Sequence, residues 1–291
     1  RMTRANDSCA MREYLGLAFL AIVLATPRLW AAAATPFSLG DQGGIVVSVT
    51  LNGAGPFKML LDTGATHSAI TTDIADLIGA RVVAQTNVIS PVGSAVRPIV
   101  AVQTLAIGPI SVDVILPSVA PERSFDPKGE IKGLIGQDVL AGLRYTLDFK
   151  RRVIEWHDAA PRQGGTMLQL SFEHGRYLVA LRQPGTTLRF VPDSGAGGLV
   201  LFEGRSGPRF PSIATGETVE LSTATGSHAA AVVRLPELRI GDRILRNVRA
   251  VTIRGDETHP AAGDGLLPLH LFGRVTFDGP ARTLILDMMF F

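Results

Sequence analysis

Cysteine is almost absent from this chain. The 291 residues include one, Cys9, which precedes an apolar stretch near the N-terminus. Since the rest of the sequence has no thiol, disulfides cannot stabilise it, and a disulfide-dependent miniprotein is excluded. Stability has to come from hydrophobic burial, and 46% apolar residues over this length are enough for one large core or two moderate ones. A disordered chain is therefore excluded as well.

An excess of positive or negative charge is also lacking in most of the sequence. From position 35 onward the sequence has 24 basic and 24 acidic residues, so the net charge of +2 comes from the N-terminal segment. A neutral body has no basic surface for a polyanion, and we expect no nucleic-acid partner. Aromatic residues make up only 6%, against 31 glycines and 18 prolines. This composition favours short strands joined by tight turns over a helical bundle, and we expect an all-β fold.

Long apolar runs are missing too, apart from one near the N-terminus. This 11-residue run, at 15–25, follows Arg12 and is followed by four alanines that end at Ala34. A helix of this length is too short to cross a hydrocarbon core of about 30 Å. The pattern predicts a signal peptide within residues 1–34 and a periplasmic or secreted protein that begins near Thr35. An uncleaved membrane anchor is the alternative, and a membrane contact is expected only in that case.

The sequence repeats itself in three places. The matching segments are LLDTGA at 60–65 with VPDSGA at 191–196, Gly-Ser at 93–94 with Gly-Ser at 226–227, and GLIG at 133–136 with GLLP at 265–268. Three landmarks in one order at nearly one spacing indicate two related lobes, which we place at 35–160 and 161–291. Within each lobe apolar residues alternate with polar ones, which is typical of half-buried strands.

Each lobe carries an apolar strand that runs into Asp-[Thr/Ser]-Gly-Ala. The two aspartates are Asp62 and Asp193, and an approximate two-fold axis between the lobes would bring them together. Two carboxyl groups held that close cannot both ionise, so they share one proton. The charged member can then take a proton from a bound water while the protonated member donates one to a substrate carbonyl. The repeat therefore predicts a carboxyl dyad that activates water.

These motifs resemble those of the aspartic proteases, and in particular those of the retropepsin-like bacterial group. LLDTGAT at 60–66 is similar to the first motif of that group, and LIGQD at 134–138 to its second. The resemblance implies two related, six-stranded barrel lobes of the retropepsin or pepsin type with an active-site cleft between them. It also implies an aspartic endopeptidase that cleaves peptide or protein substrates through Asp62 and Asp193, without a metal or cofactor.

The same resemblance assigns further residues to the site. They are Thr63, Gly64, Ser194 and Gly195 in the active-site loops, and Gly93 and Gly226 at the tips of two hairpin flaps over the substrate. The hydroxyl groups of Thr63 and Ser194 would lock the two loops together. Asp138, in the second motif, is expected to cap a short helix rather than to act in catalysis. The six histidines are scattered and lack the spacing of a metal site.

Lobe two departs from lobe one near its aspartate. Pro192 precedes Asp193, and Pro268 stands where lobe one has Gly136. Both prolines predict a distorted second loop, so one alternative function is a non-catalytic peptide-binding protein with a degenerate second lobe. Another is a homodimer that pairs Asp62 from each chain, whereas a dyad within one chain predicts a monomer. The alternatives differ in whether Asp193 lies within hydrogen-bonding reach of Asp62 in one chain.

Overall fold

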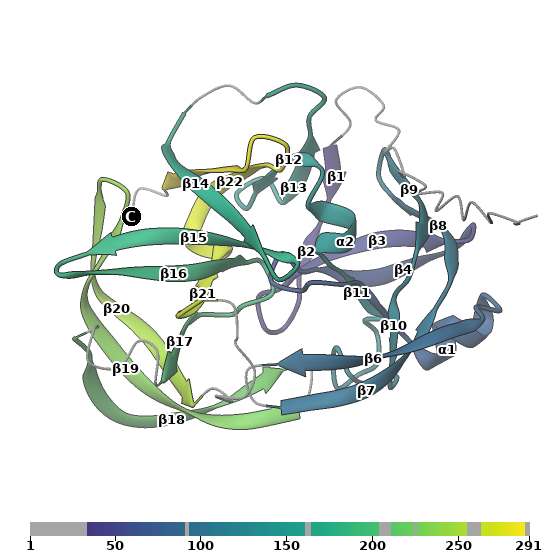
Figure 1. The fold of residues 1–291 in the computed structure, drawn as a ribbon, viewed down its shortest axis with the longest axis horizontal. Helices are drawn as coiled ribbons and strands as arrows, with labels where there is room; N and C mark the ends of the chain where they lie inside the picture. Colours follow the sequence, from purple (N-terminus) through teal and green to yellow (C-terminus); the bar gives the residue numbers. More distant parts are fainter. Residues whose placement is uncertain are drawn as a thin grey trace, which may run out of the picture.

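Strands make up most of the structure. The computed structural model describes residues 34–90, 93–160, 164–203, 211–223, 226–254 and 263–288. The predicted signal peptide lies outside these residues except for Ala34. The helices of the described residues are short: α1 (Thr72–Leu77), α2 (Gln137–Leu140) and the 3-10 helix η1 (Leu269–Leu271). The predicted all-β fold is confirmed (Figure 1). None of these described helices is long and apolar enough to cross a membrane.

One curled sheet is built entirely from the first half of the chain. The order of its described strands is β6-β7-β10-β5-β11-β4-β3-β8-β9, with β2 paired to β3. Their bounds are β2 (Ser38–Leu39), β3 (Ile45–Leu51), β4 (Ala54–Leu61), β5 (Ala69–Thr71), β6 (Val82–Ser90), β7 (Gly93–Val100), β8 (Val102–Ile107), β9 (Ile110–Ile115), β10 (Ser118–Ala120) and β11 (Gly133–Ile135). The alternating residues Val47, Val49 and Leu51 of β3 are buried, as their period of two predicts.

The second sheet contains strands from both halves of the chain. The order of its described strands is β1-β13-β12-β22-β23-β14-β15-β16-β21-β17-β20-β19-β18. Their bounds are β1 (Ala34–Pro36), β12 (Arg144–Asp148), β13 (Val153–Trp156), β14 (Thr166–Glu173), β15 (Arg176–Gln183), β16 (Thr186–Asp193), β17 (Leu199–Glu203), β18 (Ile213–Thr223), β19 (Gly226–Ile240), β20 (Arg243–Arg254), β21 (Gly265–Pro268), β22 (Phe272–Asp278) and β23 (Thr283–Met288). Since β1, β12 and β13 precede residue 160, the sheet continues across the predicted lobe boundary.

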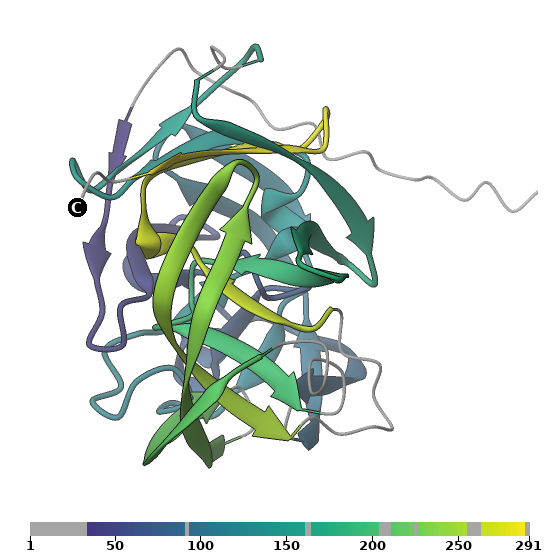
Figure 2. The ribbon, with the colours of Figure 1, turned by 90° about the vertical axis from the view of Figure 1, so that its left-hand side faces the viewer.

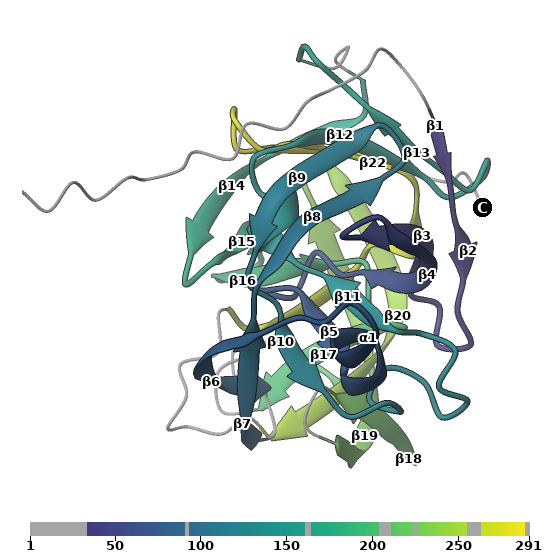
Figure 3. The same ribbon diagram turned by 90° about the vertical axis from the view of Figure 1, so that its right-hand side faces the viewer.

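The same strand pairing occurs in both halves. β11 pairs parallel to β4 and antiparallel to β5, as β21 pairs parallel to β16 and antiparallel to β17. β10 then runs parallel to β5, as β20 runs parallel to β17. Figure 3 shows β4 and β11 side by side in the first lobe. The prediction of two related lobes is confirmed, and β4 and β16, which lead into the repeated motifs, hold equivalent places.

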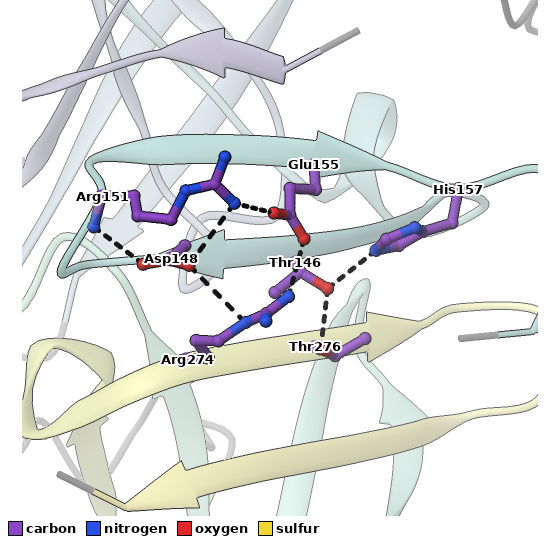
Figure 4. Close-up of polar contacts among 7 residues, drawn as sticks. All are labelled: Thr146, Asp148, Arg151, Glu155, His157, Arg274 and Thr276. Atoms are coloured by element: carbon purple, nitrogen blue, oxygen red, sulfur yellow. Dashed lines mark hydrogen bonds and ion pairs between the residues drawn. The ribbon is translucent and has the colours of Figure 1, made fainter. Parts of the chain in front are cut away.

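The two lobes are joined where β12 pairs antiparallel with β22. Both strands have the pattern Arg-x-Thr-x-Asp, at 144–148 and at 274–278. The opposing residues are Arg144 with Asp278, Thr146 with Thr276, and Asp148 with Arg274. The two threonine hydroxyls lie 2.8 Å apart in the middle of the pairing (Figure 4). The strands β12 and β22 thus carry the same pattern and are complementary to each other, because antiparallel pairing places each arginine opposite the aspartate of the other lobe.

These opposite charges form ion pairs with buried carboxylates. Arg144 Nε donates to Asp278 Oδ1 at 2.9 Å, and Arg274 Nε lies 3.7 Å from Asp148 Oδ2. The side chains of both aspartates are at most 5% exposed, so their charges interact with little screening by water. Arg274 also donates to Glu155 at 2.7 Å (Figure 4). Each lobe therefore supplies an arginine for a buried aspartate of the other.

Apolar contacts extend across the same junction. Tyr145 of β12 stacks on Phe277 of β22, with ring centroids 5.0 Å apart and ring planes 20° apart. Both rings are almost fully buried. The main cluster of buried apolar side chains includes residues of both lobes, so the halves share one core. Burial of this common apolar surface adds to the ion pairs that hold the lobes together.

Replacing Arg144 tests the contribution of the junction to stability. We expect Arg144→Met to lower the free energy of unfolding by about 2–3 kcal/mol, because the buried carboxylate of Asp278 loses its cationic partner. Lys58→Met removes an exposed ion pair with Glu130 and should change the same quantity by less than about 1 kcal/mol. Urea unfolding of the two variants and the parent measures both effects. Equal effects would show that the junction does not depend on the buried ion pair.

Candidate active site

The two motif aspartates lie at the ends of equivalent strands. Asp62 directly follows β4, and Asp193 is the last residue of β16. Each strand has neighbours on both sides, β3 and β11 in the first lobe and β15 and β21 in the second. Strands in the interior of a sheet place their ends in the middle of the molecule. Asp193 is accordingly only 7% exposed, while Asp62 is partly exposed.

Each aspartate accepts two backbone N–H groups of its own loop, in both cases through Oδ1. The donors are Gly64 and Ala65 to Asp62, at 2.9 and 3.1 Å, and Gly195 and Ala196 to Asp193, at 2.7 and 3.1 Å. These contacts fix the orientation of each carboxyl group, and they favour its charged form. Because the two sets match, the second loop keeps the conformation of the first. The prediction of a distorted second loop is wrong.

The prolines fit the second lobe for separate reasons. Pro192 takes part through its carbonyl, which accepts from Thr63 Oγ1 at 2.7 Å, so its missing N–H leaves this contact intact. Pro268 has a φ of −70°, which its ring favours. In lobe one, by contrast, a Cβ added to Gly136 would lie 2.7 Å from the carbonyl carbon of His67. The first loop therefore requires a glycine at this place because the backbone of His67 passes so close.

Thr63 and Ser194 lock the loops of the two lobes together. Thr63 Oγ1 donates to the Pro192 carbonyl at 2.7 Å and accepts the N–H of Ser194 at 3.0 Å. Ser194 Oγ donates to the Leu61 carbonyl at 2.6 Å and accepts the N–H of Thr63 at 3.0 Å. All four hydrogen bonds are buried, where a lost partner is most costly. The two hydroxyl groups singled out in the sequence thus contact each other's loops reciprocally.

The lock brings the two carboxyl groups into contact. The side chains of Asp62 and Asp193 lie close together within one chain, because a Cβ added to Gly195 would lie 3.3 Å from the Oδ1 atom of each. The loop glycines permit this approach because they have no side chain. A Cβ added to Gly64 would lie 2.7 Å from Asp193 Cγ, and one added to Gly195 would lie 3.2 Å from Asp62 Cγ. Either substitution would push the two carboxyl groups apart.

Burial raises the pKa of both carboxyl groups. For Asp62 it outweighs the N–H groups of Gly64 and Ala65, and the pKa lies above the usual 3.8. For Asp193, burial and then the negative charge of Asp62 raise the pKa to about 8. The positive charge of Arg176 acts in the opposite direction on both pKa values. Around neutral pH the pair therefore holds one proton.

The first loop is also supported from behind by residues that the sequence did not single out. Gln137 Nε2 donates to the carbonyl of Thr63 at 2.7 Å. Gln137 belongs to the LIGQD segment, so its neighbourhood was identified but its role was not. In lobe two His270 lies near the backbone of Ala196, and burial lowers the pKa of His270. The N–H groups that hold each aspartate thus match between the two loops, whereas the side chains that contact the loops from behind differ.

Asp138 has a structural role that differs from the predicted one. Helix α2 has Gly136 at its N-cap, so the prediction of Asp138 as the cap is wrong. The carboxylate of Asp138 instead accepts the N–H and the hydroxyl of Ser68, at 2.9 and 2.8 Å. Ser68 follows the first loop, and its Oγ accepts the N–H of Gly136 at 3.1 Å. This chain of contacts ties the second motif of lobe one to its first.

Two long hairpins, β6–β7 and β18–β19, contain the predicted flap glycines. Gly93 pairs with Ser90 and Gly226 with Thr223, so each glycine begins the returning strand after a two-residue turn. The turn residues lie outside the described residues. Both hairpins lie on the same side of the molecule, the lower side in Figure 1, and Figure 2 turns the long green strands of lobe two toward the viewer. Contact of these hairpins with a substrate stays a prediction.

The chemistry available to this arrangement is that of two carboxyl groups sharing a proton. Such a pair can accept a proton from water at one oxygen and donate one at another. Within the described part of the chain, His, Cys, Asp and Glu side chains form no group of three or more that could hold a metal ion.

A comparison with protein families agrees with this geometry. The family model described as aspartyl protease matches the chain twice, at residues 47–139 and 179–270, which together are more than half of it. The chain belongs to the aspartyl protease family. Each match contains one aspartate of the pair, and each falls in one lobe, so the aspartyl protease is bilobal and retropepsin-like, as the motifs indicated. No curated protein matches the chain significantly.

Truncating Ser194 tests the lock between the lobes of this aspartyl protease. Ser194→Ala removes two of the four cross-lobe hydrogen bonds and leaves the buried N–H of Thr63 without its acceptor. We expect the free energy of unfolding to fall by about 2–4 kcal/mol. Ser38→Ala, at an exposed position of β2, should change it by less than about 0.5 kcal/mol. Guanidinium unfolding compares the two, and equally small losses would contradict the lock.

Proposed function

We propose that the protein is an aspartic endopeptidase that hydrolyses peptide bonds with Asp62 and Asp193 of one chain. The observation that carries this proposal is the close approach of the two carboxyl groups, each held by two N–H groups of a matching loop. Membership of the aspartyl protease family supports the same reaction. The substrate is a peptide or protein, and the proposed reaction needs no cofactor because the carboxyl pair itself activates the attacking water.

The single proton of the pair determines the first step. Burial and the negative charge of Asp62 raise the pKa of Asp193 to about 8, so we assign the proton to Asp193 and the carboxylate to Asp62. Asp62 accepts a proton from water while the water oxygen bonds to the carbonyl carbon of the peptide. Asp193 at the same time donates its proton to the carbonyl oxygen, which gives a neutral gem-diol. The charge has then moved from Asp62 to Asp193, and the pair still holds one proton.

The second step reverses these roles. Asp62 donates its new proton to the peptide nitrogen, and Asp193 takes a proton from one hydroxyl of the gem-diol. The C–N bond then breaks, which releases an amine and a carboxylic acid and restores the starting state of the pair. No covalent bond forms between enzyme and substrate. Buried carboxyl groups suit both steps because each must change charge without a large rearrangement of water.

A non-catalytic peptide-binding protein would require a second loop that has lost its function. The N–H groups of Gly195 and Ala196 hold Asp193 as their equivalents in lobe one hold Asp62. A homodimer that pairs Asp62 from each chain would require a free surface at the lobe junction. Here β12 and β22 of one chain already pair with each other. Both observations favour the catalytic monomer over these alternatives.

Asparagine variants test the proposed dyad. Asp62→Asn and Asp193→Asn should each lower kcat for peptide hydrolysis by about 10³-fold, because an amide can neither accept nor supply the proton. Asp76→Asn, at an exposed position of α1, should leave kcat unchanged. A fluorogenic peptide library, assayed across pH, gives the rates, and fluorescence anisotropy checks that the inactive variants still bind peptide.

Two outcomes would contradict the proposal. Full activity of Asp193→Asn would exclude the dyad within one chain and favour the homodimer. Failure of the parent protein to cleave any peptide at any pH, while it still binds a statine-type mimic of the gem-diol, would favour the peptide-binding protein.

The pH dependence of hydrolysis follows from the pKa values of the pair. Because Asp193 loses its proton with a pKa of about 8, activity should fall above that pH, when both carboxyl groups are charged. Because the pKa of Asp62 is raised from 3.8, activity should already fall at a pH above that value, when both groups are protonated. We therefore expect a bell-shaped plot of kcat/KM against pH. A plateau that extends to either extreme would contradict one shared proton.

A further inference from the structure

The surroundings of the carboxyl pair differ between the lobes at a turn that lies beside each motif loop. Gly43 and Gly175 occupy equivalent turns before β3 and β15, and both have a positive φ, 83° and 77°. A Cβ added to Gly43 would lie 3.9 Å from the Cα of Gly197, and one added to Gly175 would lie 3.4 Å from the Thr66 side chain. Thr66 and Gly197 are each the fourth residue after a motif aspartate. The residues that follow the two turn glycines are therefore equivalent as well.

These next residues are Gly44 and Arg176. A Cβ added to Gly44 would lie 3.9 Å from the Cα of Gly195, the glycine beside Asp193. By the two-fold relation, the side chain of Arg176 starts beside the first loop, which carries Asp62. The electrostatic influence of the guanidinium on both carboxyl groups agrees with this position. The carboxyl pair thus has a glycine without a side chain, Gly44, beside the loop of Asp193, and the cationic side chain of Arg176 beside the loop of Asp62.

The guanidinium of Arg176 has a buried donor without a partner in the described structure. Its Nε is buried without a hydrogen-bond acceptor, and neither Asp62 nor Asp193 forms an ion pair with it. A buried donor without an acceptor is unfavourable, and a guanidinium has five N–H groups to satisfy. By contrast, Arg144 and Arg274 each contact a carboxylate at the lobe junction. Arg176 therefore has donors available beside the proposed reaction centre.

We propose that Arg176 is a specificity-determining residue that binds an acidic side chain of the substrate close to the scissile bond. A carboxylate suits the site because the planar guanidinium can donate two parallel hydrogen bonds to its two oxygens. A lysine or arginine at the same substrate position would place a second cation against Arg176 and be rejected. Since Gly44 offers no such group, the preference applies to one side of the scissile bond. The inference rests on the proposed function and adds the substrate class.

Matched peptides test this preference. Each set has one sequence with Glu, Gln or Lys at a single position, scanned over three residues on either side of the cleaved bond. At one position, kcat/KM of the parent enzyme should be about tenfold or more higher for Glu than for the isosteric Gln, as for a hydrogen bond to a charged group. Arg176→Gln should abolish this ratio, and Arg176→Glu should reverse it in favour of Lys.

Control variants separate recognition from general effects. Arg182→Gln, at an exposed position of the same strand, should keep the preference for Glu. The Gln peptide should be cleaved by Arg176→Gln, which shows that the variant folds. Where Arg176→Gln does not fold, Arg176→Met keeps the aliphatic stem and should lose the ratio in the same way.

The possible failures are distinguishable. Equal rates for Glu and Gln peptides at every position, or a ratio that survives in the Arg176 variants, would overturn the role of Arg176 and leave the proposed peptidase intact. Failure of the parent enzyme to cleave any peptide of the scan or of the library would overturn both.

Discussion

Two carboxyl groups in contact inside a protein repel each other when both are charged, and the rest of this structure has to resist that repulsion. The groups would separate if the lobes could move apart. The reciprocal hydrogen bonds of Thr63 and Ser194 oppose this, since separation would break four buried hydrogen bonds. The paired strands β12 and β22 oppose it at a greater distance. Contacts far from the pair therefore help to keep the two carboxyl groups close enough to share one proton.

The centre of the site could be predicted because the sequence repeats. An approximate two-fold axis brings equivalent atoms together where they lie near it, so two aspartates at equivalent strand ends meet when the lobes associate through those ends. The same reasoning holds for Thr63 and Ser194, which follow those aspartates. The all-β fold was predictable for a similar reason, because alternating apolar residues in segments such as β3 have only one face to bury.

Contacts without a counterpart in the repeat could not be predicted. The sequence shows that Pro192 lacks an N–H, but only the structure shows that its carbonyl is the group in use. Asp138 lies where a helix cap is common, yet the hydroxyl and N–H of Ser68 compete successfully for its carboxylate. Arg176 belongs to none of the sequence motifs. A charged residue after a turn glycine is ordinarily exposed to solvent, so the sequence gives no reason to place it in the site. Its position beside the loop depends on how the two lobes meet.

The complementarity of β12 and β22 has a consequence for how this molecule can change over evolutionary time. A strand that pairs with its own copy is what two identical chains need to form a symmetric dimer, and two such halves joined in one chain keep that pairing. In a dimer of identical chains every substitution appears twice, once on each side of the axis. A duplicated and fused chain is free of this restriction. Gly44 and Arg176 differ while the loops around them match, so this protein combines a chemically one-sided centre with a symmetric interface.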